Sequence, residues 1–81
     1  MSHDDVYIAG KVERALAEDQ RTHELGVHAE VSGDAVVLRG EVAGGQRRRL
    51  VAEVAAEAAP GLTIRNEVSV TEVLPPDEAG T

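Results

Sequence analysis

The sequence contains no cysteine, no phenylalanine and no tryptophan, and Tyr7 is its one aromatic residue. Without cysteine the chain forms neither disulfides nor thiolate metal sites, so the fold must be stable without disulfide cross-links. With a single ring, binding by stacking several aromatic side chains is excluded. No stretch approaches the ~20 apolar residues of a membrane span, and no basic and apolar leader opens the sequence. We therefore expect a cytoplasmic protein with a small aliphatic core.

Positive charge is also scarce, since fifteen acidic residues face eight basic ones and the net charge is −7. Such a chain repels nucleic-acid backbones and anionic membranes at long range, so any such contact must be local. Phosphate-binding glycine loops, G-x-S-x-G elbows, H-E-x-x-H helices and KH-type G-x-x-G turns are missing. His3, His23 and His28 lack the spacing of metal ligands. The residues predict a protein without enzymatic activity and without a metal, cofactor or nucleic-acid partner.

Hydrophobic periodicity predicts two helices and three strands. Apolar residues recur at helical spacing from about Asp5 to Glu18 and from about Gln46 to Ala59, and Pro60 and Gly61 stop the second helix. Apolar and polar residues alternate in the segments predicted to be strands, which are Val27–Ser32, Ala35–Val42 and Leu62–Thr71. The expected order is helix, strand, strand, helix, strand.

This order predicts how the elements pair. Gly33, in the turn "SGD", is expected to take a positive φ and fold the first two strands into an antiparallel hairpin. The helical crossover makes the second and third strands parallel. The predicted fold is an α/β (α+β) two-layer sandwich of αββαβ order, with a three-stranded mixed sheet and two helices on one face. Residues 4–73 form the single domain, and residues 74–81, "LPPDEAGT", are expected to be a disordered tail or linker.

Three residues are expected to serve the fold at positions that break the pattern. Gly40 lies on the core face of the central strand, where a missing side chain permits a bulge or the close approach of the first helix. Asn66 stands on an apolar strand face, so its amide is expected to bond backbone near Gly40 or Ala43. Leu25, in the first connection, is expected to plug the core.

The chain resembles the BON domain family, named for bacterial OsmY and nodulation proteins. The resemblance is carried by "DDVYIAGKVERALAED", "VHAEVSGDAVVLRGEV" and "QRRRLVAEVAAEAAPGLTIRNEVSV", and it spans about Asp4 to Val70. It includes the Val-x-Leu-x-Gly-x-Val pattern that ends at Val42, the Pro60-Gly61 pair and the family's Asn, matched by Asn66. The order and spacing of these pieces are more specific than any one of them.

The resemblance implies a module that binds phospholipid headgroups or tethers proteins to a membrane-associated assembly, often in a stress response. Tyr7, Lys11 and Arg14 fall at i, i+4 and i+7 on the first helix, and an aromatic with two cations is a minimal headgroup contact. Arg47 and Arg48 are expected to assist this contact, although side chains of consecutive helical residues point about 100° apart. The opposing interpretation has Tyr7 closing the edge of the core and the cations merely solvated.

A second class of function remains open from the sequence. Some cytoplasmic BON domains accompany CBS or LysM domains, which implies a protein-interaction or self-assembly module. Ala52, Ala56 and Ala59 are expected to form a small-residue stripe opposite the core face of the second helix. That stripe, or an open sheet edge, offers a route to weak homo-association or to a protein partner.

Overall fold

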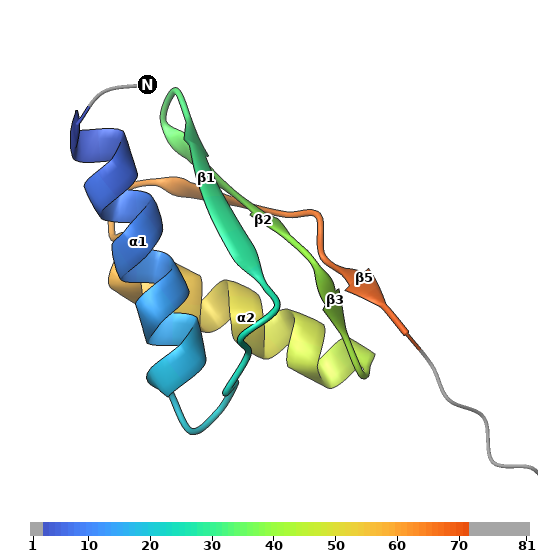
Figure 1. Ribbon diagram of the computed structural model, residues 1–81. Helices are drawn as coiled ribbons and strands as arrows, with labels where there is room; N and C mark the ends of the chain where they lie inside the picture. The colour runs from blue at the N-terminus through green and yellow to red at the C-terminus, as the bar shows by residue number, and fades with distance from the viewer. Residues whose placement is uncertain (1–2, 72–81) are drawn as a thin grey trace, which may run out of the picture.

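The computed structural model describes residues 3–71, which form two helices and five short strands (Figure 1). Helix α1 spans His3–Glu18 and helix α2 spans Gly45–Ala58, so α2 begins and ends within one residue of its prediction and α1 begins two residues earlier. The strands are β1 (His28–Ser32), β2 (Ala35–Arg39), β3 (Glu41–Val42), β4 (Thr63–Asn66) and β5 (Ser69–Val70). The predicted tail and the domain end at residue 73 lie outside the described residues.

The predicted pairing of the strands is confirmed. β1 runs antiparallel to β2, with Val31 opposite Val36, and β2 runs parallel to β4, with Leu38 opposite Asn66. The resulting strand order is β1-β2-β4, and both helices pack against the same face of this mixed sheet (Figure 1). Gly33 has a φ of 62° in the turn between β1 and β2, as its turn chemistry predicts.

The second and third predicted strands are each divided, which corrects the expectation of continuous strands. β2 ends at Arg39 and β3 resumes at Glu41, while β4 and β5 are separated at Glu67 and Val68. The hydrogen bonds nevertheless continue across the break, since the amide of Ser69 donates to the carbonyl oxygen of Gly40 at 2.8 Å. The sheet is therefore bent at Gly40, with β3 and β5 forming a parallel extension.

Gly40 allows the bend because its backbone adopts a conformation that other residues rarely reach. Its φ is 143°, and a Cβ atom there would lie 2.5 Å from the carbonyl oxygen of Gly26 and 3.1 Å from the Cα of Val27. The close approach is made by the segment leading into β1. The expectation that α1 approaches Gly40 is therefore wrong.

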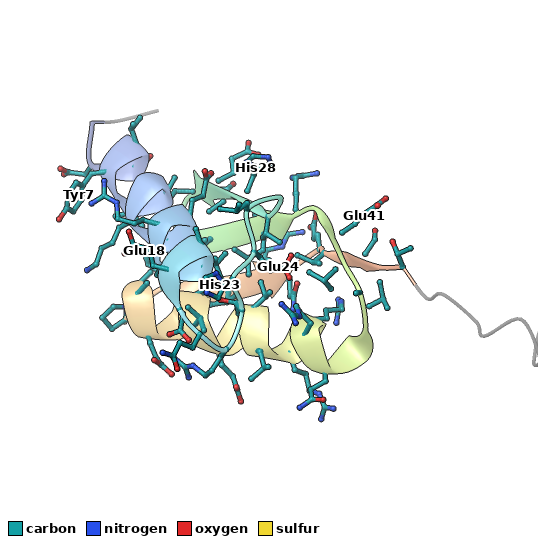
Figure 2. All side chains as sticks on the ribbon, turned by 60° about the horizontal axis from the view of Figure 1, so that its bottom comes forward. Tyr7, Glu18, His23, Glu24, His28 and Glu41 are labelled. Atoms are coloured by element: carbon teal, nitrogen blue, oxygen red, sulfur yellow. The ribbon has the colours of Figure 1, made fainter. Side chains whose placement is uncertain are left out.

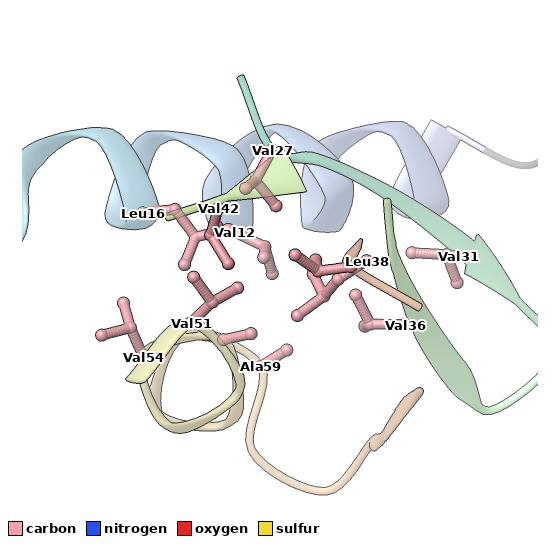
Figure 3. Packing of buried hydrophobic residues seen from close by; sticks show 12 residues of the cluster. Val12, Leu16, Val27, Val31, Val36, Leu38, Val42, Val51, Val54 and Ala59 are labelled. Carbon is pink, nitrogen blue, oxygen red and sulfur yellow. The ribbon is translucent and has the colours of Figure 1, made fainter. Parts of the chain in front are cut away.

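One aliphatic cluster joins the two layers (Figure 3). Val12 and Leu16 of α1 face Val51 of α2, and Val36 and Leu38 of β2 close the cluster from the sheet side; all five are fully buried. The predicted core faces of α1, β1 and β2 are thus confirmed, and the central strand is the most shielded of the sheet.

Three residues lie elsewhere than predicted. Ala59 is only 6% exposed: its amide donates to the carbonyl oxygen of Ala55 one helical turn earlier, and it joins the same core cluster as that buried residue. Leu25 is 82% exposed, and its predicted place as the anchor of the first connection is taken by Thr22, which is fully buried and donates to the carbonyl oxygen of Leu16. Val70, which the alternation of apolar residues along Leu62–Thr71 predicts to face inward, is exposed beyond the bend.

Candidate binding surface on helix α1

The outer face of α1 brings together the aromatic and cationic residues singled out in the sequence. Tyr7, Lys11 and Arg14 follow one another at helical spacing, and all three side chains are exposed. Tyr7 is 69% exposed and projects outward near the start of the helix (Figure 2). It therefore does not close the edge of the core.

The structure adds an apolar residue that the sequence pattern did not reveal. Val6 is 57% exposed, and together with Tyr7, Gly10, Lys11 and Arg14 it lines a shallow depression, called here the cationic hollow. Val6 lies six residues before Val12 and so about 120° around the helix from that buried residue, outside the apolar stripe. A valine outside the apolar stripe of the helix was the sequence signal for this surface. The hollow combines an aliphatic residue, an aromatic ring and two cations.

The cations of this surface differ from most others in the chain, which form ion pairs or hydrogen bonds within the domain. All eight lysine and arginine residues lie within residues 3–71, and five make ion pairs or hydrogen bonds inside the domain: Arg21, Arg39, Arg47, Arg48 and Arg65. Within the described part of the chain, the other three are without such a partner: Lys11, Arg14 and Arg49. Two of the three free cations therefore lie side by side in the cationic hollow.

Arg47 is held by the first connection. Its guanidinium donates to the carbonyl oxygen of Thr22 and lies 3.0 Å from a carboxylate oxygen of Glu24. Figure 1 shows α2 beginning beside β3, on the side of the molecule away from the start of α1. Arg47 thus fastens the start of α2 to the segment after α1, and the structure does not bring it to Tyr7.

Arg48 points in a different direction and binds the backbone of the third predicted strand. Its Nε donates to the carbonyl oxygen of Val68 at 2.8 Å, and its Nη2 donates to that of Asn66 at 2.7 Å. Asn66 returns the contact, since its Nδ2 donates to the carbonyl oxygen of Arg48 at 2.8 Å while its Oδ1 accepts from the amide of Val68. The amide of Asn66 is satisfied by backbone, but by α2 and Val68 rather than by Gly40 or Ala43.

The same contacts close parts of both sheet edges. Arg48 occupies outward carbonyl groups next to β4, and Glu13 of α1 accepts the amide of Ala29 on β1 at 2.9 Å. The small-residue stripe on α2 is also incomplete, because Ala59 is buried in the core. The surfaces that favoured self-assembly are smaller than the sequence suggested.

A separate charged cluster ties the connection after α1 to α2. The guanidinium of Arg21 donates to the carboxylates of Asp19 and Glu57, at 2.9 Å and 2.7 Å for its Nη2. Hydrogen bonds from Arg21 lower the pKa of Asp19 to about 2 and hold the pKa of Glu57 below its ordinary value. These exposed groups pair with one another, so we interpret the cluster as structural.

A family model described as BON domain matches residues 4–72 of the 81-residue chain. The chain belongs to the BON family. A search of curated proteins found no significant match. BON domains are known as phospholipid-binding or membrane-associated modules, and the family is one of binding modules rather than enzymes. Neither helix of this BON domain, within residues 3–71, is long and apolar enough to cross a bilayer.

Proposed function

We propose that this BON domain is a non-enzymatic module that binds anionic phospholipid headgroups through the cationic hollow of α1. The observation that supports the proposal is the pairing state of the cations: Lys11 and Arg14 are free, adjacent and flanked by exposed Val6 and Tyr7. A tyrosine beside aliphatic and basic residues suits the boundary between headgroups and acyl chains.

The strength of this contact is limited by the acidity of the domain. Two cations near an anionic surface contribute about 1 kcal/mol each. The net charge of −7 opposes the approach of the rest of the molecule. Binding is therefore weak, and it falls steeply with salt because the Debye length shrinks to about 10 Å at 0.1 M. Arg47 and Arg48 take no part in this proposal, since Nη1 of Arg47 and Nε and Nη2 of Arg48 hold these side chains to backbone inside the domain.

The test is co-sedimentation with vesicles of phosphatidylglycerol and phosphatidylcholine, in which Arg14→Glu is compared with Arg49→Glu. Both variants change the net charge equally, and both replace a cation that has no partner among residues 3–71. Reversing Arg14 removes one favourable contact and adds a repulsive one, so we expect binding to fall by about 2 kcal/mol, or roughly 30-fold. Arg49→Glu should change it only a few-fold.

Two further results complete the test. Vesicles of phosphatidylcholine alone should not retain the domain, and about 0.5 M salt should release it from the mixed vesicles. Equal losses for Arg14→Glu and Arg49→Glu would mean that only the overall charge matters. That result, or binding that is indifferent to salt, would refute a specific role for the cationic hollow.

A further inference from the structure

A second depression lies on the other side of Tyr7, between α1 and the turn that follows α2. It is lined mainly by aliphatic side chains and is called here the apolar hollow: Tyr7, Ile8, Lys11, Ala58, Ala59, Pro60 and Leu62. Ile8, Ala58 and Leu62 are only partly buried and pack against the main core from outside. The apolar hollow is therefore an open extension of the core at the surface.

The two hollows share a boundary. Tyr7 and Lys11 line both of them, so the free ammonium group of Lys11 belongs to a ridge with cations on one side and aliphatic groups on the other. A ligand that satisfies both sides must carry a negative charge a short distance from an apolar group. This is the chemistry of an anionic lipid, whose phosphate is joined through a short glycerol unit to its acyl chains.

We propose that the apolar hollow receives the first methylene groups of an acyl chain while the phosphate of the same lipid lies against Lys11 and Arg14. This inference rests on the function proposed above and adds a second subsite to it. An acyl chain needs no hydrogen-bond partner, which suits a lining to which residues 3–71 contribute no polar side chains besides Tyr7 and Lys11. A bound peptide segment would have to leave its backbone groups unsatisfied there.

The proposal predicts a dependence on chain length. Each methylene group buried in the apolar hollow should tighten binding about fourfold, the equivalent of about 0.8 kcal/mol, until the hollow is full. The probes are inorganic phosphate and a series of alkyl phosphates from methyl to octyl, kept below their micelle concentrations, with octyl glucoside as the uncharged comparison. Binding is followed by amide and methyl chemical shifts of the labelled domain, in particular those of Ile8 and Leu62.

We expect affinity to rise over the first few methylene groups and then level off, with shifts at Ile8 and Leu62 that inorganic phosphate does not produce. Affinity that does not depend on chain length, with shifts confined to Lys11 and Arg14, would overturn the acyl subsite and leave headgroup binding intact. Octyl glucoside binding as tightly as octyl phosphate would overturn the coupling of the two hollows.

A pair of variants separates this inference from the proposed function. Ala58→Leu places a larger side chain in the apolar hollow, and Ala56→Leu places the same side chain on an exposed part of α2. Ala58→Leu should abolish the dependence on chain length while vesicle binding persists, and Ala56→Leu should change neither. Unchanged chain-length dependence in Ala58→Leu would contradict the subsite. If the unaltered domain binds neither phosphates nor anionic vesicles, the proposed function itself is contradicted.

Discussion

Replacing Gly40 with alanine tests the bend on which the sheet is built. The new Cβ would meet the carbonyl oxygen of Gly26 at 2.5 Å, a backbone atom that can move only with the start of β1. Overpacking of this kind costs about 1–3 kcal/mol, and a side chain at a φ of 143° costs about 1–3 kcal/mol more. The expected loss is about 2–6 kcal/mol.

That loss is large for this domain. A chain of 81 residues with about 0.05–0.15 kcal/mol per residue has a free energy of unfolding of about 4–12 kcal/mol. At about 4–8 °C per kcal/mol, the melting temperature should fall by at least about 8 °C. Circular dichroism during heating and urea titration measures both quantities, and complete unfolding of the variant is the upper end of the same expectation.

Gly33→Ala is the matched control. Gly33 also has a positive φ, of 62°, but a Cβ atom there would meet nothing within 4 Å. This variant carries the backbone cost without the contact, so it should lose about 1 kcal/mol. If Gly40→Ala were no more destabilised than Gly33→Ala, the approach of Gly26 would not be what requires a glycine.

Two further predictions concern arginines. Arg48→Met keeps the aliphatic stem but leaves the carbonyl groups of Asn66 and Val68 without their donor, so we expect about 1–3 kcal/mol lower stability in urea, against little change for Arg49→Met; equal effects would contradict the strand contact. Arg21→Met should be less stable than the parent near pH 6, where the carboxylates of Asp19 and Glu57 are charged. Their pKa values are lower in the folded state, so the stabilisation is present above about pH 4 and disappears as the pH falls to about 2. A deficit of the same size at pH 2.5 and pH 6 would count against this cluster.

The elements and their pairing could be predicted because they depend on short-range patterns. The 3.6-residue spacing of Val12 and Leu16, the alternation along β1 and the turn at Gly33 each act over a few residues. The partner of Gly40 could not be predicted in this way, because Gly26 approaches from fourteen residues earlier and neither residue has a side chain to mark the contact.

For the candidate surface, too, short-range spacing could be predicted from the sequence and long-range contacts could not. Helical spacing placed Tyr7, Lys11 and Arg14 together, but it could not show that Arg47 and Arg48 are engaged elsewhere. Three of their partners are backbone carbonyl groups, which every residue carries and which leave no signal in the sequence. The fourth, the carboxylate of Glu24, lies 23 residues before Arg47. Ala59 was misplaced although it follows the buried Ala55 by four residues, a spacing that puts both residues near the same face of the helix.

The central claim is that the domain meets anionic lipid with the outer face of α1, and Tyr7 allows a direct measurement. Because Tyr7 is the one aromatic residue of the chain, all intrinsic fluorescence of the protein comes from this surface. Titration at low salt with phosphatidylglycerol vesicles should change the tyrosine emission saturably, and about 0.5 M salt should reverse the change. Phosphatidylcholine vesicles should leave it unaltered. Emission that stays constant while the domain is seen to sediment with anionic vesicles would show that another surface makes the contact.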